Sequence, residues 1–154
     1  MSIDKVREYF KKYNMEDKIK EFDVSSATVI DAAKALNTEG KRIAKSLSFK
    51  TKDKVLLIIL AGDAKISNSK YKQLFHEKAH MLSYDEVEKL IGHPVGGVCP
   101  FAINDGVEVY LDESLKRFKT VFPAWGSANS AIELTIKELE DTSNYISWID
   151  ISTY

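Results

Sequence analysis

The stretch "IAKSLSFKTKDKVLLIILAG", residues 43–62, sets the centre of the fold. Its second half, from Val55 on, is an apolar run of leucine, isoleucine and valine, which is typical of a central strand buried on both faces. In its first half, every second residue from Ile43 to Phe49 is apolar except Lys45. Alternation of period two predicts another strand, and "TKDK" between the halves predicts a turn.

The segments around this pair predict further helices and strands. Hydrophobic spacing and helix caps favour helices over residues 2–13, 25–37 (capped by Ser26), 70–79, 83–91 (a capping box, with Gly92 as the stop) and 135–141. Strands are expected over residues 19–24, 107–112, 118–127, 131–135 and 144–152, with "NDG" (104–106) as a hairpin turn before the second of them. The pattern predicts one α/β domain over residues 1–154, with a mixed, largely antiparallel sheet.

Composition narrows the function classes. The formal net charge is −1 and 29% of residues are charged, which argues against a general nucleic-acid coat protein. The single cysteine fits a reducing compartment, and the charged amino terminus is not a signal peptide. The longest apolar run is too short for a membrane span. We therefore expect a cytoplasmic protein without a membrane partner.

The segment "GHPVGGVCPFAIN", residues 92–104, combines three glycines and two prolines within an apolar frame. Gly96 and Gly97 lack a Cβ, so they can present backbone N–H groups to a ligand oxygen at close range. Pro100 stiffens the far side of the loop. The alternative is a tight turn that only joins a helix to a strand.

Lys45 is the second candidate, because a lysine among apolar neighbours on a strand face is unusual. Its side chain can snorkel to water, which is the commoner outcome. It can instead point into a pocket as a fixed positive charge for a phosphate or carboxylate.

Two further motifs admit a chemical interpretation. "HEKAH", from His76 to His80, matches the H-E-x-x-H pattern of a helical zinc site with Glu77 as base. However, a new helix is expected to start after Ser83, so the helix that carries the motif must end almost at His80 and would support a metal poorly. No third ligand is evident either, so zinc hydrolysis ranks third among the functions. Cys99, six residues after His93, has no identifiable catalytic partners, and a small buried hydrophobe is the default for a lone cysteine.

Three of these features occur in one order along the chain: the lysine in "IAKSLSF", the loop "VGGVCPFAI" about fifty residues later, and "WGSANSAIELT" near the end. In this arrangement the chain resembles the YbaK-like family, the aminoacyl-tRNA editing proteins related to the editing domain inserted in bacterial prolyl-tRNA synthetase. The resemblance implies a barrel-like mixed sheet flanked by helices. It also implies hydrolysis of the ester that joins a wrong amino acid to its tRNA, often alanine or cysteine on a proline tRNA.

The resemblance assigns roles to particular residues. Lys45 matches the functional lysine of the family. The substrate-cradling loop and the small residues opposite it correspond to Gly96, Gly97, Val98, Cys99, Pro100, Gly126 and Ser127. No metal or other cofactor is implied, and the expected partners are the aminoacylated 3′ end of a tRNA and an aminoacyl-tRNA synthetase.

Three positions depart from the better-known specificities. Phe22 stands where members acting on cysteinyl esters tend to have tyrosine, and Ala131 stands where they have an acidic residue. Ser46 follows the lysine where alanine-specific relatives often have asparagine. The leading hypothesis is a deacylase that acts in trans, and the alternative is a non-catalytic module that binds an aminoacyl-tRNA or a synthetase in the same cleft.

Overall fold

The computed structural model describes residues 2–154 and contains helices and strands that alternate along the chain. The helices are α1 (Ser2–Lys11), α2 (Val29–Leu36), α3 (Asn68–Phe75), α4 (Tyr84–Ile91) and α5 (Ile136–Ser143). The strands are β1 (Ile19–Glu21), β2 (Ile43–Lys50), β3 (Val55–Ala61), β4 (Lys65–Ile66), β5 (Glu108–Asp112), β6 (Thr120–Pro123), β7 (Ser130–Ile132), β8 (Leu134–Thr135), β9 (Ser147–Ile149) and β10 (Ser152–Thr153). Short 3-10 turns cover Glu16–Lys18, Gly40–Arg42 and Glu113–Arg117.

The main sheet has six strands in the order β8-β6-β2-β3-β5-β9. The pairs β8–β6 and β2–β3 are antiparallel, whereas β6–β2, β3–β5 and β5–β9 are parallel. Two small antiparallel sheets, β1–β7 and β4–β10, flank it. The predicted mixed α/β fold is confirmed, and the sheet curves as an open half-barrel whose edges are β8 and β9.

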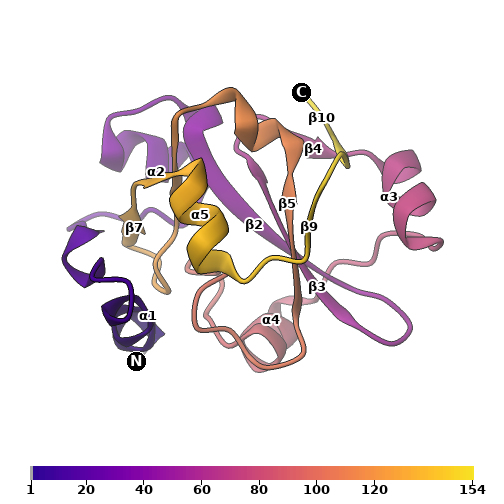
Figure 1. The fold of residues 1–154 in the computed structure, drawn as a ribbon, viewed down its shortest axis with the longest axis horizontal. Helices are drawn as coiled ribbons and strands as arrows, with labels where there is room; N and C mark the ends of the chain where they lie inside the picture. The colour runs from indigo at the N-terminus through magenta and orange to yellow at the C-terminus, as the bar shows by residue number, and fades with distance from the viewer. Residues whose placement is uncertain (1) are drawn as a thin grey trace.

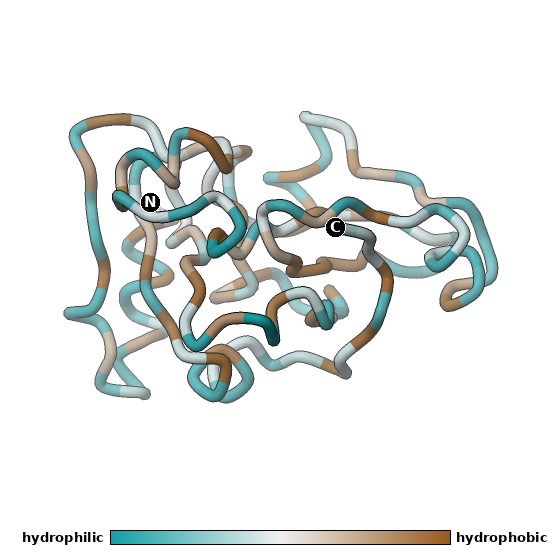
Figure 2. Tube along the Cα trace, turned by 90° about the horizontal axis from the view of Figure 1, so that it is seen from above, coloured by the Kyte–Doolittle hydropathy of each residue, from teal (hydrophilic) through white to brown (hydrophobic). Residues whose placement is uncertain are grey.

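The central hairpin predicted from the opening stretch is also confirmed. All of β3 pairs with β2, from Ala61 opposite Ala44 to Val55 opposite Lys50. Six consecutive residues of β3, Leu56 to Ala61, are buried because neighbouring strands and helices cover both faces. Figure 1 shows this hairpin running diagonally through the molecule, with α2 near one end and α3 near the other. Figure 2 shows hydrophobic stretches along the segments that cross the middle of the trace.

Three details differ from the sequence predictions. α2 is capped by Thr28, whose side chain accepts from the backbone N–H of Asp31, so Ser26 is not the cap. The third helix ends at Phe75 instead of reaching residue 79, because His76 adopts a left-handed conformation (φ 63°). The hairpin at "NDG" is wrong: β5 enters the sheet parallel to both β3 and β9, so the turn at Gly106 ends a long connection.

α1 fastens the glycine loop to the body of the molecule. The Phe10 ring stacks on Trp125 with centroids 4.5 Å apart, and it meets Phe101 edge-to-face at 4.7 Å. All three side chains are fully buried. Aromatic pairs of this kind contribute about 0.5–1.5 kcal/mol each beyond area burial. The first helix therefore holds together the two segments, residues 92–104 and 125–135, that the sequence assigns to the site.

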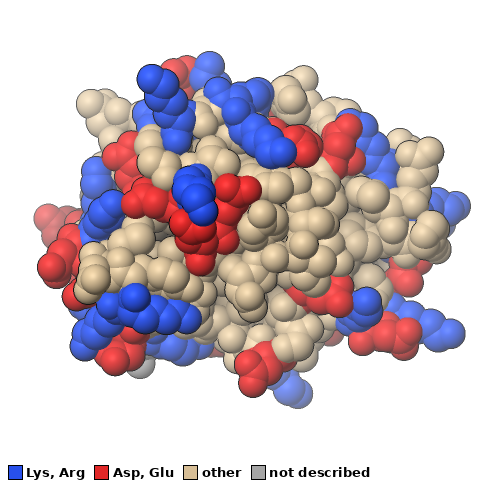
Figure 3. All heavy atoms as spheres, viewed as in Figure 1, with Lys and Arg blue, Asp and Glu red and all other residues tan. Residues whose placement is uncertain are grey.

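Charged side chains of both signs are mixed on the face shown in Figure 3, around an uncharged central area. Among residues 2–154, no helix is both long enough and apolar enough to cross a membrane.

Candidate functional site

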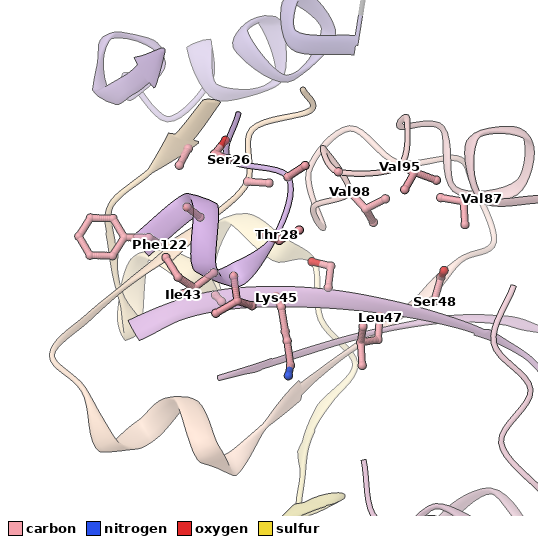
Figure 4. A pocket seen from close by; sticks show the side chains of 18 of the residues that line it. Ser26, Thr28, Ile43, Lys45, Leu47, Ser48, Val87, Val95, Val98 and Phe122 are labelled. Carbon is pink, nitrogen blue, oxygen red and sulfur yellow. The ribbon is translucent and has the colours of Figure 1, made fainter. Parts of the chain in front are cut away.

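A cavity of about 450 Å³ lies beside β2, between α2, α4 and the glycine loop. Its floor is β2 from Ile43 to Ser48, and its walls come from residues 26–32, residues 81–87, the loop at 95–98 and the β6–β7 segment. Figure 4 shows the Ser48 side chain directed toward Val95 and Val98 of the loop. Segments distant in sequence thus meet at one hollow, where ligand sites usually lie.

One edge of β2 opens into this cavity. On that edge β2 pairs with β6 only at Ile43 and Ala44. Further along, an isolated bridge joins Phe49 to Met81. Between these contacts, residues 45–48 line the cavity and no strand pairs with their outer edge.

The direction of the neighbouring hydrogen bonds shows which groups face the cavity. The Leu82 N–H donates to the Ser48 carbonyl (3.1 Å), and the Lys50 N–H donates to the His80 carbonyl (2.9 Å). Because backbone groups alternate along a strand, those of Ser46 point to the same outer edge. The N–H and C=O of Ser46 are therefore available to a ligand, as on other open sheet edges.

Gly96, one of the predicted substrate-binding residues, borders the cavity. Its φ is +92°, a conformation that L side chains rarely adopt. A Cβ built there would lie 2.9 Å from the Cβ of Ala27, which also lines the cavity. A glycine is therefore required at residue 96 both by its conformation and by the close approach of the segment before α2.

Gly97 has a different reason to be glycine. Its N–H donates to the Pro94 carbonyl, and its own carbonyl accepts from the Gly126 N–H, both at 3.0 Å. A Cβ on Gly97 would lie 2.6 Å from the carbonyl carbon of Gly126 and closer still to the Ser127 nitrogen. The loop and the small residues opposite it thus touch directly, and Gly97 serves that packing, whereas the cavity wall is formed by Gly96 and Val98.

The other predicted loop and partner residues lie one layer behind the cavity. Cys99 and Pro100 are buried, and neither lines the cavity. Gly126 has φ +84° and packs on α1, where a Cβ would lie 2.9 Å from Val6 Cγ2. The Ser127 hydroxyl bonds to Ser130 (2.6 Å), which does line the cavity.

The buried Cys99 belongs to a small polar network with His93. His93 Nε2 lies 2.6 Å from the Phe101 carbonyl and 3.5 Å from the Cys99 Sγ, and the Ser2 hydroxyl bonds His93 Nδ1. The carbonyl can only accept, so Nε2 carries the proton and Nδ1 accepts from Ser2. Burial raises the pKa of Cys99 to about 12 and lowers the pKa of His93 to about 4. A neutral thiol beside a neutral imidazole is a packing element, not a nucleophile and its base.

This network gives a testable pH dependence of stability. The His93 pKa is lowered in the folded state, so between pH 6.5 and pH 4 the unfolded chain binds a proton that the folded chain does not. The free energy of unfolding is therefore unaffected by the titration of His93 above pH 6.5. As the pH drops from 6.5 to 4, it falls by roughly 1.4 kcal/mol per pH unit, about 3 kcal/mol in all. Denaturant titrations of wild type and His93→Gln should show this slope in the difference between the two profiles, because carboxyl groups with a lowered pKa, such as that of Glu86, act equally in both proteins. Parallel profiles for the two proteins would refute the assignment.

Lys45 lies at the cavity floor, but its ammonium group is turned away from the loop. Figure 4 shows its side chain leaving β2 on the side opposite Val95 and Val98. The Nζ atom donates to the carbonyls of Gly62 (3.2 Å) and Ala64 (2.5 Å). Burial lowers the pKa of this ammonium, and the nearby Asp63 carboxylate opposes that effect. The group is thus a half-buried, anchored cation and does not snorkel freely to solvent.

The glutamate of "AIELT" also has a structural partner. Glu133 Oε2 accepts from Arg42 (3.2 Å) and from the Thr120 hydroxyl (2.6 Å). Arg42 in turn lies over the Phe122 ring, 4.9 Å from its centroid, and Phe122 lines the cavity. Glu133 therefore supports the β2–β6 wall and does not face the cavity.

The "HEKAH" segment does not form the geometry that a helical zinc site needs. The helix ends at Phe75, and His76 caps it in the left-handed conformation. From Glu77 to Ser83 the chain is not helical, so the two imidazoles do not share a helix face. Within residues 2–154, no group of three or more His, Cys, Asp or Glu side chains is placed to hold a metal ion.

Three features of the site are missing from the sequence predictions: the open edge at Ser46, the exposed Tyr84 ring at the cavity mouth, and the wall formed by the segment before α2. The open edge depends on which strands pair at long range. The capping box at Ser83 does locate Tyr84 as the first residue of its helix, but nothing in the sequence shows what that helix borders.

Comparison with known proteins agrees with this architecture. The model of the aminoacyl-tRNA editing domain family matches residues 24–142. The chain belongs to this family. The matched region contains β2, α4 and the glycine loop, and it thus includes every wall of the cavity.

Relatives in Bacillus subtilis (strain 168) extend the comparison. The chain is 55% identical over 152 residues to the uncharacterized protein YwhH, covering 98% of this chain and 97% of YwhH. It is 31% identical over 90 residues to the proline–tRNA ligase of the same organism, which is 58% of this chain but only 16% of that enzyme. The match to the ligase is thus confined to a small part of the synthetase.

One solved structure shares nearly the whole fold of this editing-domain protein. It is described as a proposed trans-editing enzyme for prolyl-tRNA synthetase. The TM-score is 0.88 at 27% identity, and the match covers 99% of this chain and 98% of that one. The structural match thus shows the fold, and the family model shows the family.

Proposed function

We propose that this protein is a trans-acting aminoacyl-tRNA deacylase, which hydrolyses the ester of a tRNA charged with a wrong, small amino acid such as alanine or cysteine on a proline tRNA. The observation that carries the proposal is the cavity bounded by Gly96 and the open edge of β2. Family membership and the similarity to a proline–tRNA ligase support the choice of substrate.

The reaction requires little from protein side chains. A water molecule, or a hydroxyl of the terminal ribose, attacks the acyl carbon. The bond between that carbon and the tRNA oxygen then breaks, and the oxygen leaves with a proton. When water attacks, the products are the free amino acid and the tRNA; when the ribose attacks, water completes the hydrolysis afterwards. Among the described residues that line the cavity, only Lys45 and Tyr84 have titratable side chains. Attack without a protein nucleophile or a carboxylate base is consistent with that lining.

The backbone supplies the stabilisation that this chemistry needs. The carbonyl oxygen gains negative charge as the tetrahedral intermediate forms, and N–H donors fixed at that position lower the barrier. The Ser46 N–H on the open edge of β2 is our candidate donor, with Gly96 and Val98 closing the opposite wall. The proposed role of the loop is to let the acyl group approach closely at Gly96, where the backbone carries no side chain.

Lys45 is proposed as the catalytic cation of the site. Two of its three N–H groups donate to the carbonyls of Gly62 and Ala64, on the side of β2 away from the loop, so its positive charge would act on the substrate through its electrostatic field. A partly desolvated charge acts more strongly on nearby anionic groups than a solvated one.

Selection among amino acids would follow from size. The cavity is lined by five alanines among other apolar side chains: Ala27, Ala32, Ala44, Ala124 and Ala131. A pocket of this kind separates substrates that differ by one methylene by about 10–200-fold. The absence of an acidic side chain at residue 131 favours an uncharged, small side chain in the substrate.

The second candidate is a binding module that uses the same cavity without catalysis. The observation that favours it is the direction of the Lys45 ammonium, which faces carbonyls of its own chain. With a net charge of −1, the protein would bind tRNA modestly, and an aminoacyl-tRNA synthetase is the partner that would deliver it.

A deacylation panel separates the two candidates. Proline tRNA charged with alanine, cysteine, serine or proline is incubated with the wild type, with and without prolyl-tRNA synthetase, and the remaining ester is measured. We expect turnover of at least one mischarged tRNA and none of the prolyl ester. Binding of these tRNAs without turnover would favour the binding module.

A cavity-filling variant shows where turnover takes place. Val98→Trp should abolish turnover by occupying the cavity, whereas Val24→Trp, at an exposed position, should not. Thermal unfolding of both variants checks that they are folded. Full activity in a folded Val98→Trp protein would show that the reaction takes place elsewhere.

A further inference from the structure

Three exposed apolar side chains surround the mouth of the cavity. Met81, Tyr84 and Val95 are 57%, 77% and 44% exposed, and all three line the cavity. Single exposed apolar side chains are common on protein surfaces, but several that lie together beside a cavity usually mark a contact surface. Tyr84 is the only aromatic ring among them.

The backbone beneath Tyr84 is rigidly held. Tyr84 is the first residue of α4, directly after Ser83, whose side chain and Glu86 form a reciprocal capping box. Glu86 also bonds Lys50 of β2 at 2.7 Å. The preceding Leu82 N–H donates to the Ser48 carbonyl on the cavity floor. The ring is thus presented to solvent from a fixed point, at little entropic cost on binding.

The proposed substrate has a matching group at this position. The acyl group lies inside the cavity, and its ester links it to the terminal ribose of the tRNA. The ribose must therefore sit at the mouth, and the base attached to it must lie just outside. Every nucleobase has a flat π face, and stacking on an aromatic side chain needs no particular base sequence.

We propose that Tyr84 is a stacking platform for the terminal adenine of the aminoacyl-tRNA, with Met81 and Val95 as the apolar rim beside it. This inference rests on the proposed function, because it takes the occupant of the cavity to be an aminoacyl ester. Base–aromatic stacking of this kind is expected to change affinity by about 5- to 150-fold.

The test compares two substrates and three variants. The variants are Tyr84→Ala, Tyr84→Phe, which keeps the ring, and Tyr154→Ala, which removes a tyrosine of similar exposure (68%). Each is assayed on the mischarged tRNA and on the ethyl ester of the same amino acid, which has no base. Tyr84→Ala should raise KM for the tRNA by about 5- to 150-fold and leave the ethyl ester rate unchanged. Tyr84→Phe and Tyr154→Ala should behave as wild type.

Other outcomes would refute the proposed stacking role of Tyr84. An unchanged KM in Tyr84→Ala, or an equal loss on both substrates, would show that the ring does not bind the base. If the wild type hydrolyses neither substrate, the deacylase proposal fails, and the platform is then tested separately by NMR with 3′-alanylamino-3′-deoxyadenosine. Upfield shifts of the Tyr84 ring protons would support it, and unmoved ring signals would refute it.

Discussion

Replacing Lys45 by alanine is expected to lower kcat/KM for the mischarged tRNA by about 10²-fold or more, the usual cost of removing one group that stabilises a developing charge. Lys45 is the one cationic residue among the described residues that line the cavity, and its ammonium lies on the side of β2 away from the loop. Single-turnover deacylation with the variant in excess over tRNA measures this loss directly.

A structural effect of the same substitution has to be separated from the catalytic one. The carbonyls of Gly62 and Ala64 lose their shared donor, which costs about 1–3 kcal/mol where such groups stay buried. Lys45→Met keeps most of the length of the side chain without its charge, and Lys52→Ala removes a charge from the exposed turn between β2 and β3. We expect Lys45→Met to be as inactive as Lys45→Ala and Lys52→Ala to be fully active. A folded Lys45→Met protein with wild-type turnover would remove Lys45 from the mechanism.

Gly97→Ala is expected to have the second large effect, on stability and activity together. The added methyl group would lie 2.6 Å from the Gly126 carbonyl carbon, and its nearest neighbours are all backbone atoms of Gly126 and Ser127, with no flexible side chain to displace. Overpacking of this kind costs about 1–3 kcal/mol or more. The loop must shift to relieve it, and a displacement of about 1 Å in a positioning element can cost about 10²-fold in rate. Denaturant unfolding and deacylation assays measure the two effects.

Gly40→Ala is the matched control. Gly40 also has an ordinary backbone conformation, and a Cβ there would meet Val29 Cγ1 at 3.4 Å, an ordinary contact. It should change neither stability nor turnover appreciably. If Gly97→Ala were as stable and as active as Gly40→Ala, the close contact between the loop and residues 126–127 would not be needed for the site.

The central part of the fold could be predicted because local signals and long-range packing agree there. The alternation from Ile43 and the apolar run from Val55 both describe strands, and the turn between them brings them together without help from the rest of the chain. The capping box at Ser83 likewise fixes the start of α4 locally. At "NDG" the local turn signal was misleading, because β5 finds its partners in β3 and β9, far away in sequence.

The site is harder to predict than the fold, because the role of each site residue depends on which distant segments of the chain pack against it. Gly96 and Gly97 are identical as residues, and only the packing of Ala27 against one and Ser127 against the other distinguishes a cavity wall from a structural contact. The strand pattern placed Lys45 on one face of β2 but could not say which face borders the cavity. Ser46 becomes a candidate donor only because β6 leaves β2 after Ala44.

The most direct measurement of the central claim is a crystal structure of the protein with 3′-alanylamino-3′-deoxyadenosine, in which a stable amide replaces the ester. We expect the alanyl group inside the cavity beside Gly96, with its carbonyl oxygen within hydrogen-bond distance of the Ser46 nitrogen. An analogue that binds outside this cavity, or that does not bind at saturating concentrations, would show that the cavity is not the site of ester hydrolysis.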